Sequence, residues 1–106
     1  MISEKDIKLF TQGYCDIFAV ELHRHFKYPL FFVAQKAIWQ HVVVKRKGKY
    51  VDIRGAVSLK QLLAEYKSDR VLTQAEVRYN LSYCSCCKDI QQLAKKIIKE
   101  NPKRFA

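Results

Sequence analysis

The sequence predicts a small α+β domain in which N-terminal helices pack on a short antiparallel sheet and a further helix closes the chain. Its 106 residues suit one compact domain with a single core, so we expect residues 1–106 to form one domain. Hydrophobic residues make up 49% and charged residues 28%, as in ordinary globular proteins. Helical periodicity over 15–26 and 88–100 brackets a β-rich stretch over 39–55.

Two helices are expected at the N-terminus. Ser3 is a typical N-cap and predicts a helix to Phe10, which Gly13 interrupts. A second helix is predicted from Cys15 to Phe26, because its apolar residues recur at helical spacing and begin with the cysteine itself. The buried stripe of this helix therefore starts at a thiol.

The short apolar run Leu30–Ala34 predicts a strand, because Tyr28-Pro29 stops the preceding helix. The segment WQHVVVKRKGKYVDIRG at 39–55 then predicts a β-hairpin around a turn at Lys47-Gly48.

The register of this hairpin follows from its turn. It sets Val42 opposite Ile53 and Val44 opposite Val51, which places four β-branched residues on one face, toward a core. The opposite face carries Trp39, His41, Val43, Tyr50, Asp52 and Arg54. His41 and Asp52 are then diagonal neighbours, with backbones roughly 7–8 Å apart, and we expect a hydrogen bond between them.

The C-terminal half should contain two helices. Ser58 is predicted to cap a helix that runs to Tyr66, with Leu59, Leu62 and Leu63 facing inward. Residues 70–83 fit no single pattern. Lys88–Glu100 predicts a closing helix that ends at Asn101-Pro102, with its inward residues at Ile90, Leu93, Ile97 and Ile98.

Charge and cysteine usage restrict the class of protein. Lys and Arg total 20 against 10 acidic residues, a net charge of +10 that favours acidic proteins or peptides, nucleic acid or anionic surfaces as partners. The basic residues gather mainly at 45–49 and 95–104. No segment has the apolar length of a membrane span and the N-terminus lacks a signal-peptide pattern, so we expect a soluble, cytoplasmic protein with reduced cysteines.

The remaining cysteines and histidines give weak metal signals. Cys84, Cys86 and Cys87 lack Cys-x-x-Cys spacing and an evident fourth ligand, while His23 and His25 stand on different faces of one helix. We therefore expect neither metal nor cofactor. The alternative that these cysteines leave open is a nucleic-acid-binding protein whose fold is stabilised by a bound metal ion.

Cys15 is the candidate nucleophile. A thiol in the first turn of a helix faces the positive end of the helix dipole, which should lower its pKa, and the same N–H groups could hold an oxyanion with Gln12 as a second donor. Together, Cys15, His41 and Asp52 supply a nucleophile, a general base and an orienting carboxylate. The alternatives are a buried core cysteine, a half-exposed histidine and an aspartate that only pairs with Arg54 or a turn lysine.

The order of these residues resembles a known superfamily. GYCDIFAVEL followed by the hairpin segment is similar to the core of papain-like cysteine hydrolases, particularly the transglutaminase-like branch, over residues 12–55. The resemblance implies Cys15 as nucleophile, His41 as base, Asp52 as orienting residue and Gln12 as oxyanion partner. It also implies a peptidase, amidase, acyltransferase or deamidase activity, although Asp16 directly after the cysteine departs from an arrangement that favours thiolate.

Two functions are therefore expected as rivals. The first is a cysteine-dependent hydrolase or acyl-transfer enzyme that acts on an amide or ester carbonyl. The second is a non-catalytic basic interaction module, such as a mobile-element accessory protein or an inhibitor, that binds an acidic protein or nucleic acid through its +10 charge.

Overall fold

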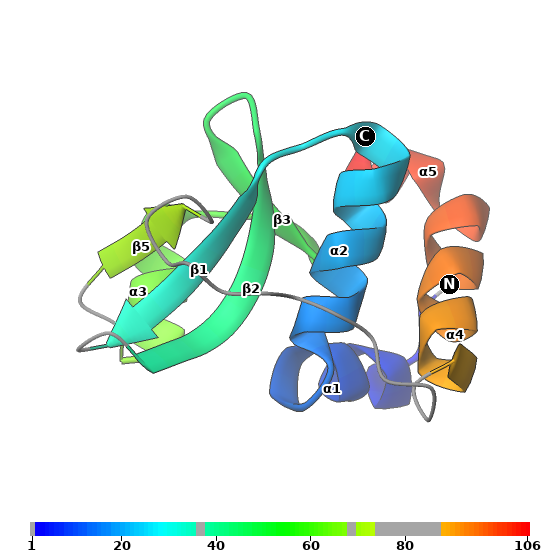
Figure 1. The fold of residues 1–106 in the computed structure, drawn as a ribbon, viewed down its shortest axis with the longest axis horizontal. Helices are drawn as coiled ribbons and strands as arrows, with labels where there is room; N and C mark the ends of the chain where they lie inside the picture. Colours follow the sequence, from blue (N-terminus) through cyan, green and yellow to red (C-terminus); the bar gives the residue numbers. More distant parts are fainter. Residues whose placement is uncertain (1, 36–37, 68–69, 74–87) are drawn as a thin grey trace.

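A computed structural model describes residues 2–35, 38–67, 70–73 and 88–106 of the chain. These residues form an α+β fold, as the sequence predicts (Figure 1). Its helices are α1 (Glu4–Gln12), α2 (Cys15–Phe26), α3 (Leu59–Glu65), α4 (Lys88–Glu100) and α5 (Pro102–Phe105). Its strands are β1 (Leu30–Gln35), β2 (Ile38–Arg46), β3 (Lys49–Asp52), β4 (Gly55–Val57) and β5 (Arg70–Thr73).

The described strands form one antiparallel sheet in the order β4-β3-β2-β1-β5. Lys47 and Gly48 connect β2 to β3 with φ angles of 44° and 84°, the left-handed pair that a two-residue hairpin turn requires. The predicted register is confirmed, because Val44 pairs with Val51. Ile53 lies one residue beyond the end of β3, yet it packs in the same core cluster as Val42.

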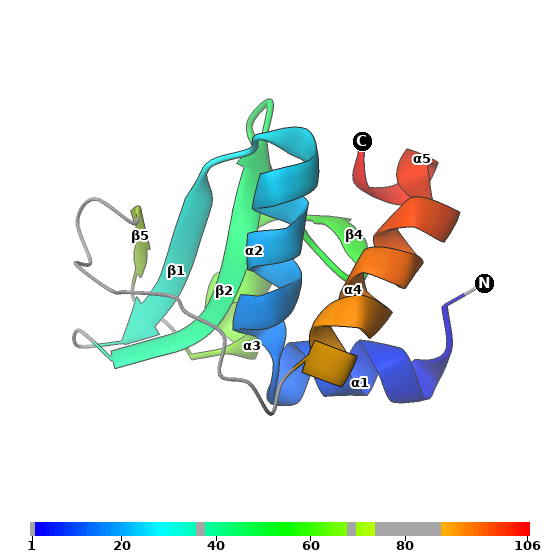
Figure 2. The ribbon, with the colours of Figure 1, turned by 45° about the vertical axis from the view of Figure 1, so that its right-hand side comes forward.

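Helices cover both faces of the sheet (Figure 2). On one face α2 packs against β2, and α4 lies on the far side of α2. The large core between these layers contains Phe10, Phe18, Leu22 and Phe105, all fully buried. Buried Glu21 accepts hydrogen bonds from Arg24 and from Gln91 of α4, at 3.1 Å each, which links the two helices.

The other face of the sheet is covered by α3. Leu62 of this helix is fully buried in a second, smaller cluster with Val33, Val43, Tyr50 and Val57. The prediction that Leu59 also faces inward is wrong, because this side chain is 46% exposed. A helix of only 7 residues buries one narrow stripe, and Leu62 occupies it.

Local sequence explains the element boundaries. Ser3 and Ser58 cap α1 and α3, accepting hydrogen bonds from the backbone N–H groups of Asp6 and Gln61 at 3.1 Å. The predicted bounds of α2 and α4 are confirmed. Among the described helices, none is long and apolar enough to cross a bilayer.

Candidate active site

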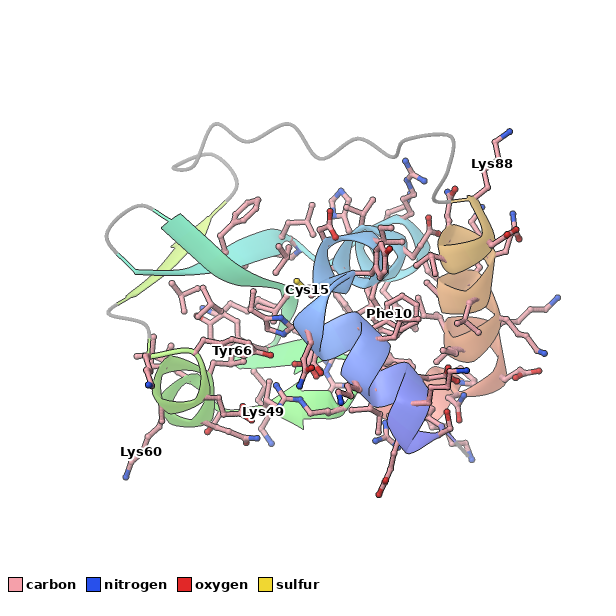
Figure 3. The ribbon with its side chains drawn as sticks, turned by 90° about the horizontal axis from the view of Figure 1, so that it is seen from below. Phe10, Cys15, Lys49, Lys60, Tyr66 and Lys88 are labelled. Carbon is pink, nitrogen blue, oxygen red and sulfur yellow. The ribbon has the colours of Figure 1, made fainter. Side chains whose placement is uncertain are left out.

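The site lies where the start of α2 meets the strands β2 and β3. Cys15 is the first residue of α2, and its side chain is directed between that helix and the sheet (Figure 3). It is 6% exposed and belongs to the main core cluster. The thiol is therefore both at a helix N-terminus and inside the core, which unites two alternatives that the sequence left open.

The predicted lowering of the Cys15 pKa is wrong. Burial raises the pKa of the Cys15 thiol to about 11, and the charge of Asp16 adds to the increase. Hydrogen bonding to the backbone of Val42, and to the first amides of α2, acts in the opposite direction but is outweighed. At neutral pH Cys15 is a thiol, and a nearby base must take its proton before or as it reacts.

His41 and Asp52 form the predicted hydrogen bond. Nε2 of His41, on β2, lies 3.0 Å from Oδ2 of Asp52, the last residue of β3. The two side chains are 0% and 3% exposed, so the expected alternative of a half-exposed histidine is wrong. Both lie on the face of the hairpin that α3 covers, which excludes water from the pair.

Arg54 fixes the carboxylate of Asp52. The Arg54 backbone N–H donates to Oδ1 at 2.8 Å, and its guanidinium Nη2 donates to Oδ2 at 2.6 Å. The second terminal nitrogen of the guanidinium, Nη1, forms an ion pair with Oε2 of Glu65 in α3 at 2.6 Å. Burial alone would raise the pKa of Asp52, but the hydrogen bonds from His41 and Arg54 lower it below its usual range. Asp52 is therefore ionised at neutral pH.

An ionised Asp52 determines the tautomer of His41. Because a carboxylate can only accept, Nε2 of His41 carries the proton and donates it. In the neutral form of the ring, the other nitrogen, Nδ1, then carries no proton and has a lone pair. It is buried and has no hydrogen-bond partner among the described residues. Its free lone pair has the character of a general base.

Tyr66 covers the imidazole. Its ring stacks on that of His41 with centroids 4.4 Å apart and planes at 10°, and its hydroxyl donates to the carbonyl oxygen of Thr11 at 3.3 Å. Burial raises the pKa of Tyr66 to about 12, so the hydroxyl stays protonated and remains a donor. Figure 3 shows Tyr66 near Cys15, on the side toward α3.

A surface hollow of about 310 Å³ lies on the outer side of Tyr66. Gln12, the predicted oxyanion partner, is exposed at the end of α1 and lines this hollow. No hydrogen bond joins Gln12 to Cys15 in the described part of the chain. The remaining walls are Ile7, Thr11, Arg54, Glu65 and Tyr66.

The other candidate ligands do not converge. His23 forms a hydrogen bond through Nδ1 to the carbonyl of Tyr28 at 2.6 Å, while His25 is exposed. The described segments contain no group of three metal-binding side chains. The cluster of Cys84, Cys86 and Cys87 lies outside the described residues.

Sequence reasoning missed Tyr66 and Glu65 as parts of this site, and it treated Arg54 only as a competing partner for Asp52. Tyr66 and Glu65 reach His41 and Arg54 from the end of a helix that begins well beyond His41 in the chain, at Leu59. No local spacing rule relates α3 to the hairpin, so the only signal was a tyrosine at the end of a predicted helix. Comparisons with known proteins found no matching family model, curated protein or solved structure.

Proposed function

We propose that the protein is a papain-like, transglutaminase-like cysteine hydrolase or acyl-transfer enzyme in which Cys15, His41 and Asp52 act as nucleophile, base and orienting carboxylate. The observation that supports this best is the buried Nδ1 of His41, which lacks a partner among the described residues. Buried polar atoms in folded proteins are nearly always hydrogen-bonded, and the exceptions often have a chemical role. A histidine kept only for stability would have little reason to leave this nitrogen unpaired.

The proposal places the base beside the nucleophile. Val42, which follows His41 in β2, packs in the same core cluster as Cys15, and the ring of Tyr66 stacks on that of His41. Catalysis requires the Cys15 S–H to come within hydrogen-bond reach of Nδ1, where the described residues show no bond. Such looseness is common in sites without substrate, where catalytic hydrogen bonds tighten only in the complex.

The reaction would proceed through an acyl-enzyme. Nδ1 of His41 takes the thiol proton as the Cys15 sulfur attacks an amide or ester carbonyl, and Asp52 stabilises the resulting imidazolium. The backbone N–H groups at the start of α2 hold the oxyanion, with Gln12 as a second donor. His41 returns its proton to the leaving amine or alcohol, and water or another nucleophile then releases the acyl group from Cys15.

The +10 charge favours an acidic peptide or protein as the acyl donor. The hollow beside Tyr66 and Gln12 offers a place for its side chain. This arrangement requires the substrate to displace part of the cover over Cys15, because the thiol is only 6% exposed.

Acylation by p-nitrophenyl acetate tests the proposal. In a variant carrying C84S, C86S and C87S, we expect a burst of nitrophenolate and an acetyl adduct on Cys15, both lost in C15S. His41→Ala and His41→Gln should each slow acylation about 10²- to 10⁴-fold, the usual effect of losing a general base. His25→Ala, which removes an exposed histidine from the same helix as Cys15, serves as the matched control.

Circular dichroism shows which variants remain folded. A folded His41→Gln protein that acetylates Cys15 as fast as the His25→Ala control would refute the catalytic role of His41. Wild-type protein that shows neither burst nor adduct would refute the proposed activity as a whole.

A further inference from the structure

We propose that the turn of the β2–β3 hairpin is the centre of a binding site for single-stranded nucleic acid, separate from Cys15. A surface hollow of about 550 Å³ lies beside this turn. Four of the residues that line it are basic and none is acidic: the lining consists of Tyr28, Lys45, Arg46, Lys47, Lys49 and Ala106. A concave surface whose charged side chains are all positive concentrates anions.

The pairing of the hairpin makes this charge unfavourable in the free protein. Arg46 stands directly opposite Lys49 in the antiparallel ladder, and Lys47 follows Arg46 in the turn with a φ of 44°. Like charges directly across a ladder destabilise it. Within the residues that the structure describes, no ion pair involves these three side chains. A bound anion would relieve their mutual repulsion.

Lys45 extends the positive surface to the other face of the hairpin. Successive side chains of a strand point to opposite faces, so the side chains of Lys45 and Arg46 point to opposite faces of the hairpin. Its ammonium group lies 5.5 Å from the centroids of both the Phe31 and Tyr50 rings. These cation–π contacts hold the side chain in place, which reduces the entropy lost when it binds a phosphate. Cations therefore lie on both faces of the hairpin beside its turn. A nucleic-acid strand that passes over the turn can place phosphates against the cations of each face.

Tyr28 gives the site a reason to prefer nucleic acid to an acidic peptide. Its ring stacks on Phe26 with centroids 5.2 Å apart and planes at 13°, and the half-buried residue also lines the hollow. A ring that is held in place and partly exposed beside several cations is the usual platform on which a single-stranded base stacks. An acidic peptide has carboxylates for the lysines but no base for the tyrosine.

The two sites lie at opposite ends of α2. Cys15 begins this helix and Tyr28 follows its end, so its 12 residues separate them by about 18 Å at 1.5 Å per residue. Figure 1 shows the β2–β3 turn and the end of α2 at the same end of the molecule, away from the junction of α1 and α2. Binding at the turn should therefore be independent of the thiol.

Fluorescence anisotropy with labelled oligo-dT and oligo-U of about ten nucleotides tests the proposal. Binding should weaken with salt, and C15S should bind like the wild type. R46A/K49A should reduce the magnitude of the slope of log affinity against log salt by about 1.4, at about 0.7 for each lost phosphate contact. K95A/K99A, which removes the same charge from exposed positions on α4, should leave the slope unchanged.

Tyr28 is tested separately from the charges. Tyr28→Leu should weaken binding about 5-fold or more without altering the salt slope, whereas Tyr28→Phe should retain affinity because a phenyl ring still stacks. An equal loss in K95A/K99A and R46A/K49A would overturn the proposal in favour of diffuse charge. Equal affinity for polyglutamate with the same dependence on Arg46 and Lys49 would overturn it in favour of an acidic peptide. No binding of either oligonucleotide at low salt would overturn it outright.

Discussion

The imidazole of His41 lies flat against the phenol ring of Tyr66, with centroids 4.4 Å apart. Tyr66 follows α3, whereas His41 is on β2, and the tyrosine hydroxyl bonds to the end of α1 through Thr11. One side chain thus joins three elements around the proposed base. Its ring closes the site on the side opposite to the main core.

Truncation of Tyr66 should open the site. Tyr66→Ala removes the ring that covers His41, so we expect faster iodoacetamide alkylation of Cys15 and a loss of about 2 kcal/mol in the free energy of unfolding, below the range for fully buried aromatic residues. Tyr66→Phe removes only the bond to Thr11 and should cost about 1 kcal/mol while alkylation stays slow. Urea denaturation and mass spectrometry of the C84S/C86S/C87S background measure both effects. Equal alkylation rates in the two variants would show that the ring does not shield Cys15.

The buried thiol should make stability fall at alkaline pH. The folded-state pKa of Cys15 is raised from 9.0 to about 11, so the contribution of the protonated thiol is complete below pH 9.0 and is lost as the pH rises to about 11. A rise in pKa of this size corresponds to about 3 kcal/mol of stability. The free energy of unfolding of the wild type should therefore decrease by about this much more than that of Cys15→Ala, measured in urea across this range. Parallel pH curves for the two proteins would contradict the raised pKa.

Asp52 should have the opposite pH dependence. Its folded-state pKa is lowered from 3.8, so its contribution is present above pH 3.8 and is lost as the pH falls through the lowered value. Asp52→Asn leaves Arg54 and His41 without their anion and should cost about 3 kcal/mol at neutral pH. The variant should also lose less stability than the wild type on acidification. A variant with an unchanged acid transition would show that the carboxylate is not the group that titrates.

Gly55 should tolerate a side chain less well than Gly48. Both have positive φ, 96° and 84°, so alanine at either position is strained by about 1 kcal/mol. A Cβ at Gly55 would also lie 3.3 Å from the backbone oxygen of Arg104, whereas one at Gly48 would meet nothing within 4 Å. We expect Gly55→Ala to lower the urea midpoint clearly more than Gly48→Ala. Because Gly55 follows the turn that holds Asp52, its substitution should also slow acylation of Cys15; equal midpoints would rule out the clash.

Much of the fold could be predicted because it depends on local rules. Capping by Ser3 and Ser58, the apolar stripe of α2 and the Lys47-Gly48 turn each act over a few residues. The turn also determined the register of β2 and β3, and with it the approach of His41 to Asp52. β4 and α5 were not predicted, because strands of three residues and helices of four carry too few residues for a period to appear.

The α+β class, the hairpin and the pair of His41 with Asp52 therefore follow from the order of residues along the chain. The environment of these residues depends on how the folded layers pack. This packing buried Cys15, which reversed the expected direction of its pKa change because the loss of hydration outweighs the helix amides. It also covered the outer face of the hairpin with α3, so that Arg54, Glu65 and Tyr66 complete the site. Burial and contacts between distant elements depend on how whole layers pack, and no local pattern in the chain encodes them.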